Sequence, residues 1–387
     1  MTGILHFVKE ILAALGRLLG DASARSTMVA GILIYSVLYP QPYVGEVVRD
    51  VPVAVIDQDN STSSRSFLRQ VDATDKAQIV VTASGMDEAQ DLFFRRDVYG
   101  IILIPAGFEQ HLLAGQPSPV AAYADGSYLL VYSNVMTAVT TVARTMGAEV
   151  NFARLTAQGL DQGLAETILA PVTVTSVPVF NPQGGYASYV IPAAFVLILQ
   201  QTLLMGIGLL HAGQRLPRGS QIWATSIAYI GLYLIWIAFT QVLLPLLYGI
   251  PRTGDLGTLL LVALPFLAAC TAMGFALSVV IPWKEGVVFF LVVMGMPLFF
   301  LSGISWPIEA IPDGLRLLSL LVPSSTAISA FVAVDQMGAA PQDIAEAVQI
   351  QIALAALYTA IALAVSGRRE RDRKGASAGE GGRSGTA

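Results

Sequence analysis

The chain has 387 residues, of which 54% are hydrophobic and 13% are charged, about half the charged share of an ordinary soluble domain. The formal net charge of −5 gives no reason to expect a nucleic-acid partner. The 3 scattered histidines and the single cysteine, Cys270, exclude a Cys/His metal cluster and an internal disulfide.

Long uncharged stretches indicate a membrane protein, since roughly 20 apolar residues form a helix that crosses a bilayer. The stretches are continuous rather than alternating, which favours helices whose backbones satisfy their own hydrogen bonds in lipid. They include residues 26–45, 219–251, 256–283, 286–308 and 347–367. We therefore predict a polytopic α-helical membrane protein with six transmembrane helices and an inserted α/β extracytoplasmic domain.

The N-terminal segment, residues 1–25, is predicted to be an amphipathic interfacial helix. Its apolar side chains recur on one helical stripe, whereas Lys9, Glu10 and Arg17 lie outside that stripe. The first transmembrane helix is expected at 26–43. A cleaved signal peptide is disfavoured, because the apolar run begins late and no small-x-small cleavage site follows it.

Residues 44–187 carry many more charges and alternate short strand-like runs with helical ones, which predicts an extracytoplasmic α/β domain. The expected strands cover residues 51–56, 79–82, 99–104, 120–123 and 172–179. The expected helices cover residues 61–71, 87–96, a short stretch after Pro105, and 132–158.

The first of these strands ends in an Asp-x-Asp sequence, Asp57-Gln-Asp59. It resembles the first motif of aspartate-nucleophile phosphatases, in which the first Asp attacks phosphorus and the pair helps to hold Mg²⁺. That chemistry also needs a lysine and further acidic partners, and Lys76 is the only lysine of the domain. We interpret the motif as a strand-to-helix turn in which Asp57, Asp59 and Asn60 cap the helix.

Residues 188–367 are predicted to form a five-helix transmembrane region with an outer-face hairpin near 306–334. The five spans are expected near 189–210, 222–248, 256–281, 287–305 and 347–366. The segment 368–387 is expected to be a cytoplasmic tail, disordered because it is rich in Gly, Ser and Ala.

Basic residues predict the orientation of these spans. In a six-span chain one side carries Arg215, Arg218, Lys284 and the basic cluster at 368–374. The charged residues of 306–346, on the other side, are mainly acidic. The positive-inside rule therefore places both termini in the cytoplasm. A seventh span at 317–334 would send the C-terminal basic cluster outside, which is why we expect a hairpin at 306–334 instead.

Several segments, in this order along the chain, carry a family resemblance. They are Val53-Ala-Val-Ile-Asp57-Gln-Asp59-Asn60-Ser61, Tyr99-Gly100-Ile-Ile-Leu-Ile-Pro105, and Leu301-Ser302-Gly303-Ile-Ser305-Trp306-Pro307 with Pro323-Ser-Ser-Thr326 after it. Together they resemble the ABC-2 type transporter permease, the membrane subunit of an ABC exporter, with a large extracytoplasmic domain after the first span. The resemblance covers residues 1 to about 367.

The resemblance implies a multi-pass permease of the bacterial cytoplasmic (inner) membrane that exports its substrate. Its implied partners are cytoplasmic P-loop ATPase subunits, a second permease subunit (homodimer or heterodimer), in some systems a periplasmic adaptor protein, and the lipid bilayer. The chain has no GxxxxGK[ST] phosphate loop of its own. We therefore expect no catalytic, cofactor-binding or metal-binding residue here, and expect ATP hydrolysis on a separate subunit.

The segment 211–221, named the coupling loop below, is the expected contact with the ATPase. It is the longest inner loop between spans and carries Gln214, Arg215 and Arg218. Many family members have an acidic Arg-Glu-x-Gly-Thr-x-Glu type segment at this place, and the acidic residues are missing here. The alternative is that both arginines only fix the topology.

Polar residues within predicted spans are the candidates for a substrate pathway. Here they are Gln200, Gln201 and Gln241, and the alternative is that each only joins helices by hydrogen bonds. Charged residues are absent from the spans, which disfavours a proton-relay transporter and suits amphiphilic cargo.

Two other functions compete with export. One is a membrane-anchored sensor or receptor whose outer domain binds a ligand, and the other is a membrane phosphatase. A sensor normally needs a cytoplasmic output domain, and the predicted cytoplasmic pieces are a short helix, short loops and a short tail. This favours a permease that uses the ATPase of a partner.

Overall fold

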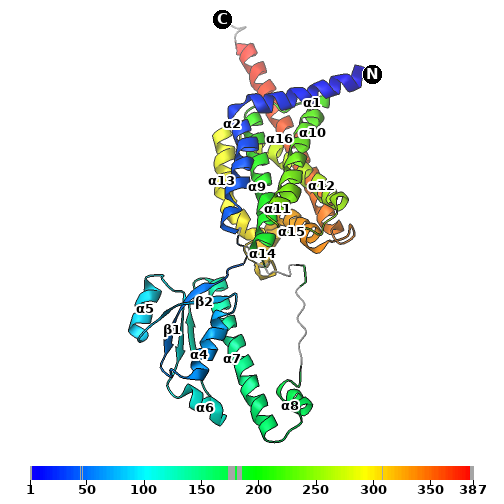
Figure 1. The fold of residues 1–387 in the computed structure, drawn as a ribbon. Coiled ribbons are helices and arrows are strands. Elements are labelled where there is room, and N and C mark those ends of the chain that lie inside the picture. The colour runs from blue at the N-terminus through cyan, green and yellow to red at the C-terminus, as the bar shows by residue number, and fades with distance from the viewer. Residues whose placement is uncertain are drawn as a thin grey trace. The chain divides into compact units, whose positions relative to one another are not determined.

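The computed structural model describes residues 2–43, 45, 47–172, 179–180, 185–306 and 308–383. The chain divides into two compact units (Figure 1). The membrane unit comprises Met1–Glu46 and Pro178–Ala387, and the α/β unit comprises Val47–Val177. The strand expected at 172–179 lies almost wholly outside the described residues.

Within the described residues, six helices are long and apolar enough to cross a membrane, as the sequence predicted. They cover Ala22–Tyr43, Ala187–His211, Ser220–Leu247, Leu256–Val280, Lys284–Leu301 and Ala345–Arg369. With the α/β unit between the first and second of them, the expected fold class is confirmed.

Two of the six spans are composed of several helical segments. The first comprises α2 (Ala22–Arg25), the π-helical η1 (Ser26–Ala30), α3 (Gly31–Leu38) and η2 (Gln41–Tyr43), and the third comprises α10 (Ser220–Ile237), the π-helical η3 (Ala238–Leu243) and α11 (Leu244–Leu247). The other spans are α9 (Tyr186–His211), α12 (Leu256–Val280), α13 (Lys284–Leu301) and the first part of α16 (Ala345–Arg383).

The amphipathic helix α1 (Thr2–Gly20) precedes the spans and lies across one end of them (Figure 1). Its Ala14 and Leu18 are buried, whereas Leu5 and Leu12 are exposed. The chain then turns at Asp21, whose carboxylate accepts a hydrogen bond from the backbone N–H of Ala24 at 2.9 Å. This N-cap starts a new helix, so the first span begins before the expected residue 26.

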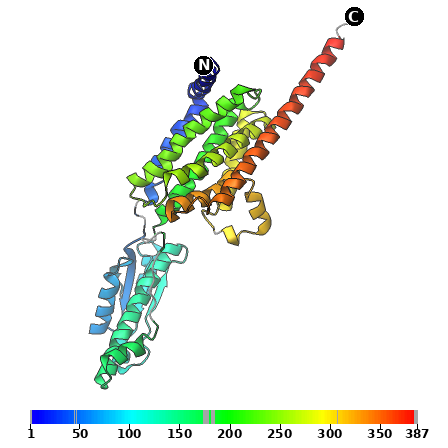
Figure 2. The same ribbon diagram turned by 90° about the vertical axis from the view of Figure 1, so that its right-hand side faces the viewer.

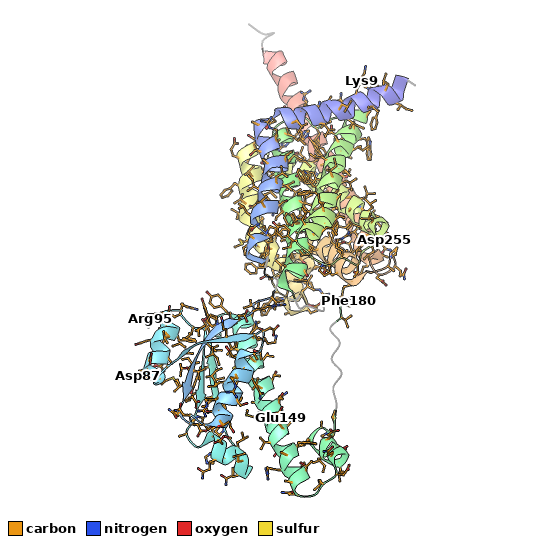
Figure 3. The ribbon with its side chains drawn as sticks, viewed as in Figure 1. Lys9, Asp87, Arg95, Glu149, Phe180 and Asp255 are labelled. Atoms are coloured by element: carbon orange, nitrogen blue, oxygen red, sulfur yellow. The ribbon has the colours of Figure 1, made fainter. Side chains whose placement is uncertain are left out.

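Contacts define the two ends of the membrane unit. At the α1 end, the Ser220 hydroxyl donates to the Glu10 carboxylate at 3.1 Å, which joins α1 to the start of α10. Lys9 points away from the spans at this end (Figure 3). At the opposite end, the Tyr189 hydroxyl at the start of α9 donates to the carbonyl of Gly303, just after α13, at 2.8 Å.

A helical hairpin is inserted among the spans from the opposite end. It comprises α14 (Asp313–Ser319) and α15 (Pro323–Met337), bent by 86° relative to each other, and is preceded by the short η4 (Ile308–Ala310). Arg252, in the loop before α12, pairs with the buried Asp335 near the end of α15, with 2.6 Å between Nη2 and Oδ1. The hairpin therefore follows the end of α13 and returns to the loop before α12, both at the opposite end.

The tip of the hairpin is held by side chains of two spans. The backbone N–H of Ser324 donates to Oε1 of Gln200 on α9 at 2.7 Å, and the amide of Gln351 on α16 donates to the carbonyl of Pro323 at 2.6 Å. The hydroxyl of Tyr358, about midway along the span of α16, donates to a carbonyl of the tip. The hairpin thus reaches about halfway into the bundle, where surrounding protein satisfies its non-helical backbone.

The α/β unit is built on a four-stranded sheet with the order β2-β1-β3-β4. The strands are β1 (Val51–Asp57), β2 (Ala77–Thr82), β3 (Gly100–Ile104) and β4 (Ala121–Ala124). β1 pairs in parallel with β2 and β3, and β3 pairs antiparallel with β4. This agrees with the expected alternation of strands and helices, with one antiparallel edge strand added.

Helices cover both faces of this sheet. They are α4 (Thr62–Asp72), α5 (Met86–Phe94), α6 (Phe108–Ala114) and α7 (Leu129–Ala157), and α8 (Gln162–Leu169) packs on α7 instead. Val53 and Val55 of β1 pack with residues of α4, α6 and α7, whereas Ala54 and Ile56 pack with residues of α5 on the other face. Successive strand residues face opposite sides, so a strand buried on both faces is continuously apolar.

The helix α16 continues beyond the last span to Arg383, at the α1 end (Figure 2). This differs from the disordered tail expected at 368–387. A helix that is already formed gains one hydrogen bond for each residue added, and the Arg- and Glu-rich start of this segment favours helix. The expectation considered only the small residues that follow Gly375.

Candidate functional site

The Asp-x-Asp motif at the end of β1 forms hydrogen bonds within the protein. One oxygen of Asp57 accepts from the hydroxyl of Ser64 at 2.7 Å, and the other accepts from the backbone N–H of Asn60 at 3.0 Å. Ser61 and Ser64 cap α4 through a reciprocal capping box. The carboxylate of Asp57 thus fixes the turn between β1 and α4.

Asp59 and Glu109 cap two helices reciprocally: Asp59, just before α4, caps α6, and Glu109, in α6, caps α4. The Asp59 carboxylate accepts from the backbone N–H groups of Gly107 at 2.7 Å and Glu109 at 3.0 Å, at the start of α6. In return, the Glu109 carboxylate accepts from the backbone N–H and the hydroxyl of Ser63 at 3.0 and 2.8 Å, in the first turn of α4. Hydrogen bonds from the Ser61 hydroxyl and then from these backbone groups hold the pKa of Asp59 below its usual range.

These reciprocal caps, named the carboxylate latch, favour the structural interpretation of the motif. Both aspartates already accept hydrogen bonds from the turn and the two helices. No group of three or more metal-ligating side chains occurs in the part of the chain that the structure describes. We therefore look for function in the membrane unit.

The coupling loop lies at the α1 end, between α9 and α10. Its Leu216 is buried, and Gly213 has a φ of +76°, where an added Cβ would lie 2.7 Å from the carbonyl oxygen of Pro282. Only glycine fits both the left-handed backbone and this close approach. His211 is buried at the start of the loop, with Nε2 2.8 Å from the hydroxyl of Tyr229 on α10. The loop is therefore held to α10 and packed against the turn after α12.

The polar residues of the coupling loop remain at the surface. Gln214, Arg215 and Arg218 are exposed, and they line a small cavity of about 70 Å³ together with Arg369 of α16. No acidic residue lines this cavity, and Arg215 forms no ion pair with any residue that the structure describes. Sequence reasoning missed Arg369, because it lies far along the chain in the segment expected to be a tail.

The structure separates the roles of the three glutamines predicted for a substrate pathway. Gln200 is fully buried and holds the tip of the hairpin through its Oε1. Gln241 lies in the π-helical turn η3, and its Nε2 donates to the carbonyl of Pro192 on α9 at 3.0 Å. Both contacts join helices, which was the alternative role for these residues.

Gln201 has different surroundings from Gln200. It lines a cavity of about 360 Å³ between α3, α9 and α13, named the Gln201 cavity. Neither its amide nitrogen nor its amide oxygen has a hydrogen-bond partner within the described residues, although both atoms are buried. A buried polar group without a partner costs about 1–3 kcal/mol, so the amide is available to a ligand or water that enters this cavity.

The remaining walls of the Gln201 cavity were missed by sequence reasoning. They are mostly apolar and aromatic, with Tyr35 and Tyr39 from α3 and the adjoining residues, Met205 from α9 and Phe299 from α13. The spacing of the two tyrosines puts them one turn apart on the first span, which was a usable signal. The cavity is thus a partly open apolar site with one amide that can fix the orientation of a ligand.

Comparisons with known proteins agree with this architecture. The profile of the ABC-2 family transporter proteins matches residues 25–364, which is most of the chain. The linearmycin resistance permease protein LnrN of Bacillus subtilis (strain 168) is 23% identical over 337 residues, covering 81% of this chain and 87% of that protein. The fold, its inserted unit and this match together show that the chain is a multi-pass membrane protein belonging to the ABC-2 transporter family.

Proposed function

We propose that this chain is the permease subunit of an ATP-driven exporter that moves substrate outward across the bacterial cytoplasmic membrane. The observation that carries the proposal is the Gln201 cavity, which offers a partly open apolar site and a buried, unpartnered amide in the membrane unit. ATP hydrolysis takes place on a separate P-loop subunit, in keeping with the family. Of the three glutamines, only Gln201 contacts cargo, whereas Gln200 and Gln241 hold neighbouring helices together.

The proposed orientation places the α1 end in the cytoplasm and the α/β unit outside. Arg215 and Arg218 lie at the α1 end, where α16 also leads into the basic cluster 368–374. The first span ends at Tyr43 and the second begins at Ala187, both at the opposite end, which is where the α/β unit is inserted. This distribution of charge is what the positive-inside rule requires of a cytoplasmic α1 end.

The coupling loop is the proposed contact with the ATPase. A pump must transmit a rigid-body movement from motor to spans, and this loop is fastened to α10 and to the turn after α12. The contact between Glu10 and Ser220 braces it through α1. Gln214, Arg215 and Arg218 are the exposed groups that a partner can reach.

Amphiphilic compounds are the proposed cargo. The walls of the Gln201 cavity are apolar except for a few neutral polar groups, so a charged cargo would lose hydration without gaining an ionic partner. The relative from Bacillus subtilis is named for linearmycin resistance, and removal of a harmful compound from the cell is one route to resistance.

The test of this function is to purify the tagged chain from its native membrane. A P-loop ATPase should copurify with it, and the complex should hydrolyse ATP. In cells in which Cys270→Ala removes the native thiol, single cysteines at Asp87 and Asp313 should react with an impermeant thiol reagent from outside, and one at Ser220 should not. Isolation with a signalling protein and no ATPase would instead favour the sensor.

A further inference from the structure

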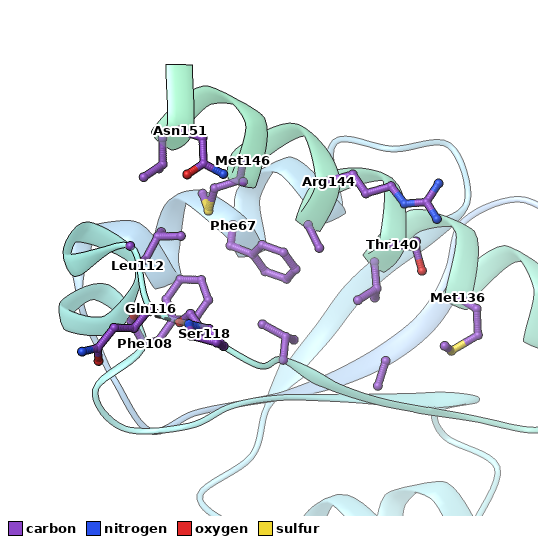
Figure 4. A pocket seen from close by; sticks show the side chains of 18 residues that line it. Phe67, Phe108, Leu112, Gln116, Ser118, Met136, Thr140, Arg144, Met146 and Asn151 are labelled. Atoms are coloured by element: carbon purple, nitrogen blue, oxygen red, sulfur yellow. Dashed lines mark hydrogen bonds between the residues drawn. The ribbon is translucent and has the colours of Figure 1, made fainter. Parts of the chain in front are cut away.

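The α/β unit contains a cavity of about 600 Å³ that the proposed transport function does not use. It lies between α7 on one side and α6 with the following segment, residues 115–120, on the other (Figure 4). It opens to solvent and lies wholly within the α/β unit. Its volume falls within the range of roughly 300–1,000 Å³ typical of small-molecule sites.

One end of this cavity is aromatic and apolar. Phe67 of α4 and Phe108 of α6 are 1% and 3% exposed and meet edge to face, with 6.1 Å between ring centroids. Leu112 and Met146 lie beside them in Figure 4. These side chains belong to the core of the unit or pack against it, so this wall of the solvent-open cavity is apolar.

The local sequence keeps the cavity open. Gly115 ends α6 with a φ of +70°, and the Ser118 hydroxyl donates to the carbonyl of Phe108 at 2.8 Å, which fixes the segment after α6 along one side of the cavity. The facing wall of α7 includes the small residues Ala143 and Gly147, and a Cβ added at Gly147 would meet no atom within 4 Å. Protein interiors are normally filled to crystal-like density, so an unfilled space of this size beside a core has room for a ligand.

The polar groups of the cavity are distributed unevenly. Gln116 and Asn151 supply neutral amides, and Arg144 is the only charged residue among those that line the cavity. Its guanidinium is exposed and extends away from the end formed by Phe67 and Phe108 (Figure 4). The cavity therefore combines an apolar wall with the cation of Arg144, and no acidic side chain lines it; a second guanidinium, that of Arg154 on α7, lies against Gly115.

We infer that this cavity binds an amphipathic small molecule with an acidic head group. Its apolar part would pack on Phe67 and Phe108, and its head would interact with Arg144. Binding requires only the α/β unit. The further idea that this ligand is the exported substrate, bound outside the membrane, rests on the proposed function. A neutral ligand would gain nothing from Arg144, and a cationic one would be repelled by it.

The test uses the full chain in nanodiscs of zwitterionic lipid and a photoreactive probe, a diazirine-bearing medium-chain fatty acid. After irradiation, peptides are analysed by mass spectrometry. Adducts are expected on the segments 108–122 and 136–151. Gly147→Phe fills the cavity and should reduce these adducts to the level seen without irradiation, and Ala143→Phe should do the same from one turn earlier.

Matched controls distinguish loss of the site from loss of the fold. Ala148→Phe adds the same side chain at an exposed position of α7 that does not line the cavity, and it should leave the adducts unchanged. Arg144→Gln should reduce labelling by the fatty acid roughly two- to fivefold, as expected for an exposed ion pair, and should not affect the corresponding fatty alcohol.

Adducts confined to the spans would overturn the inference, as would adducts on 108–122 and 136–151 that both Gly147→Phe and Ala143→Phe leave intact. Equal loss in Ala148→Phe would also overturn it, because the effect would then not depend on the cavity. The assay contains no ATPase and no transport step. Its result is therefore separate from that of the copurification experiment.

Discussion

The two units differ in how their polar side chains are satisfied. In the α/β unit, the carboxylates of Asp57, Asp59 and Glu109 accept hydrogen bonds from neighbouring helices and turns. In the membrane unit, several buried amides and hydroxyls lack a partner on at least one atom, and every such atom found in the described chain belongs to that unit. The motif that most resembles an active site is thus engaged in helix caps. The unpartnered amide of Gln201 is the better candidate for contact with a ligand.

Whether a polar group is structural or available to a ligand therefore depends on its contacts and not on its residue type. A carboxylate whose oxygens cap two helices has little freedom to do chemistry. An amide with two unpartnered atoms beside a cavity lowers stability by about 1–3 kcal/mol, a cost that a ligand or water can offset.

The largest effect is expected at the ionic contact between Arg252 and the hairpin residue Asp335. Arg252→Ala leaves Asp335, which is 1% exposed, without its partner, and breaking a buried pair in this way costs about 3–5 kcal/mol. Thermal unfolding of the purified chain in detergent should show this loss. The double variant Arg252→Leu with Asp335→Leu should recover much of it, and the exposed Arg316→Ala should have little effect. Equal stability of Arg252→Ala and wild type would contradict the pairing.

A smaller loss is expected from Gln200→Leu. The substitution removes the acceptor for the backbone N–H of Ser324 and leaves that group buried, at a cost of about 1–3 kcal/mol. The same thermal unfolding assay measures it. A variant as stable as the wild type would mean that the hairpin tip does not depend on this contact.

The neighbouring Gln201→Leu is expected to act in the opposite direction. It removes two unpartnered polar atoms, so stability should be unchanged or increase by up to about 1 kcal/mol, while stimulation of ATP hydrolysis by cargo should be lost. Comparing both leucine variants in one preparation makes each a control for the other. Destabilisation by Gln201→Leu, or normal cargo stimulation, would argue against its place in the pathway.

The smallest effect is expected from the carboxylate latch at low pH. The folded-state pKa of Asp59 lies below its ordinary value of 3.8, so the latch contributes stability above that value and loses it as pH falls through the folded pKa. In a Cys270→Ala background, a cysteine at the buried Ala77 should become reactive to a pyridyl disulfide as the pH falls below about 4. Asp59→Asn should remove most of this acid dependence. If Asp59→Asn leaves the pH dependence of this labelling unchanged, a group other than Asp59 controls the exposure of position 77.

Much of the fold follows from the sequence, because hydropathy and strand alternation are local signals. The spans and the first strands were predictable, and the early start of the first span depends on the cap that Asp21 supplies. The candidate site was harder to predict. Gln200 and Gln201 are adjacent in sequence but about 100° apart around α9, and nothing local tells which one faces the hairpin and which the cavity. Arg369 likewise joins the coupling loop only through the packing of α16.

The central claim is that the membrane unit is driven by a separate ATPase through the coupling loop. The most direct test compares recovery of the ATPase with the wild-type chain, with Arg215→Gln plus Arg218→Gln, and with Lys9→Gln plus Arg368→Gln. The last variant removes the same number of positive charges from the α1 end, outside the loop. Insertion is checked in each by outside labelling of a cysteine at Asp313.

We expect normal insertion of all three chains, with loss of ATPase recovery and of cargo-stimulated hydrolysis only in the coupling-loop variant. Full recovery and full stimulation in that variant would show instead that Arg215 and Arg218 serve only to set the topology.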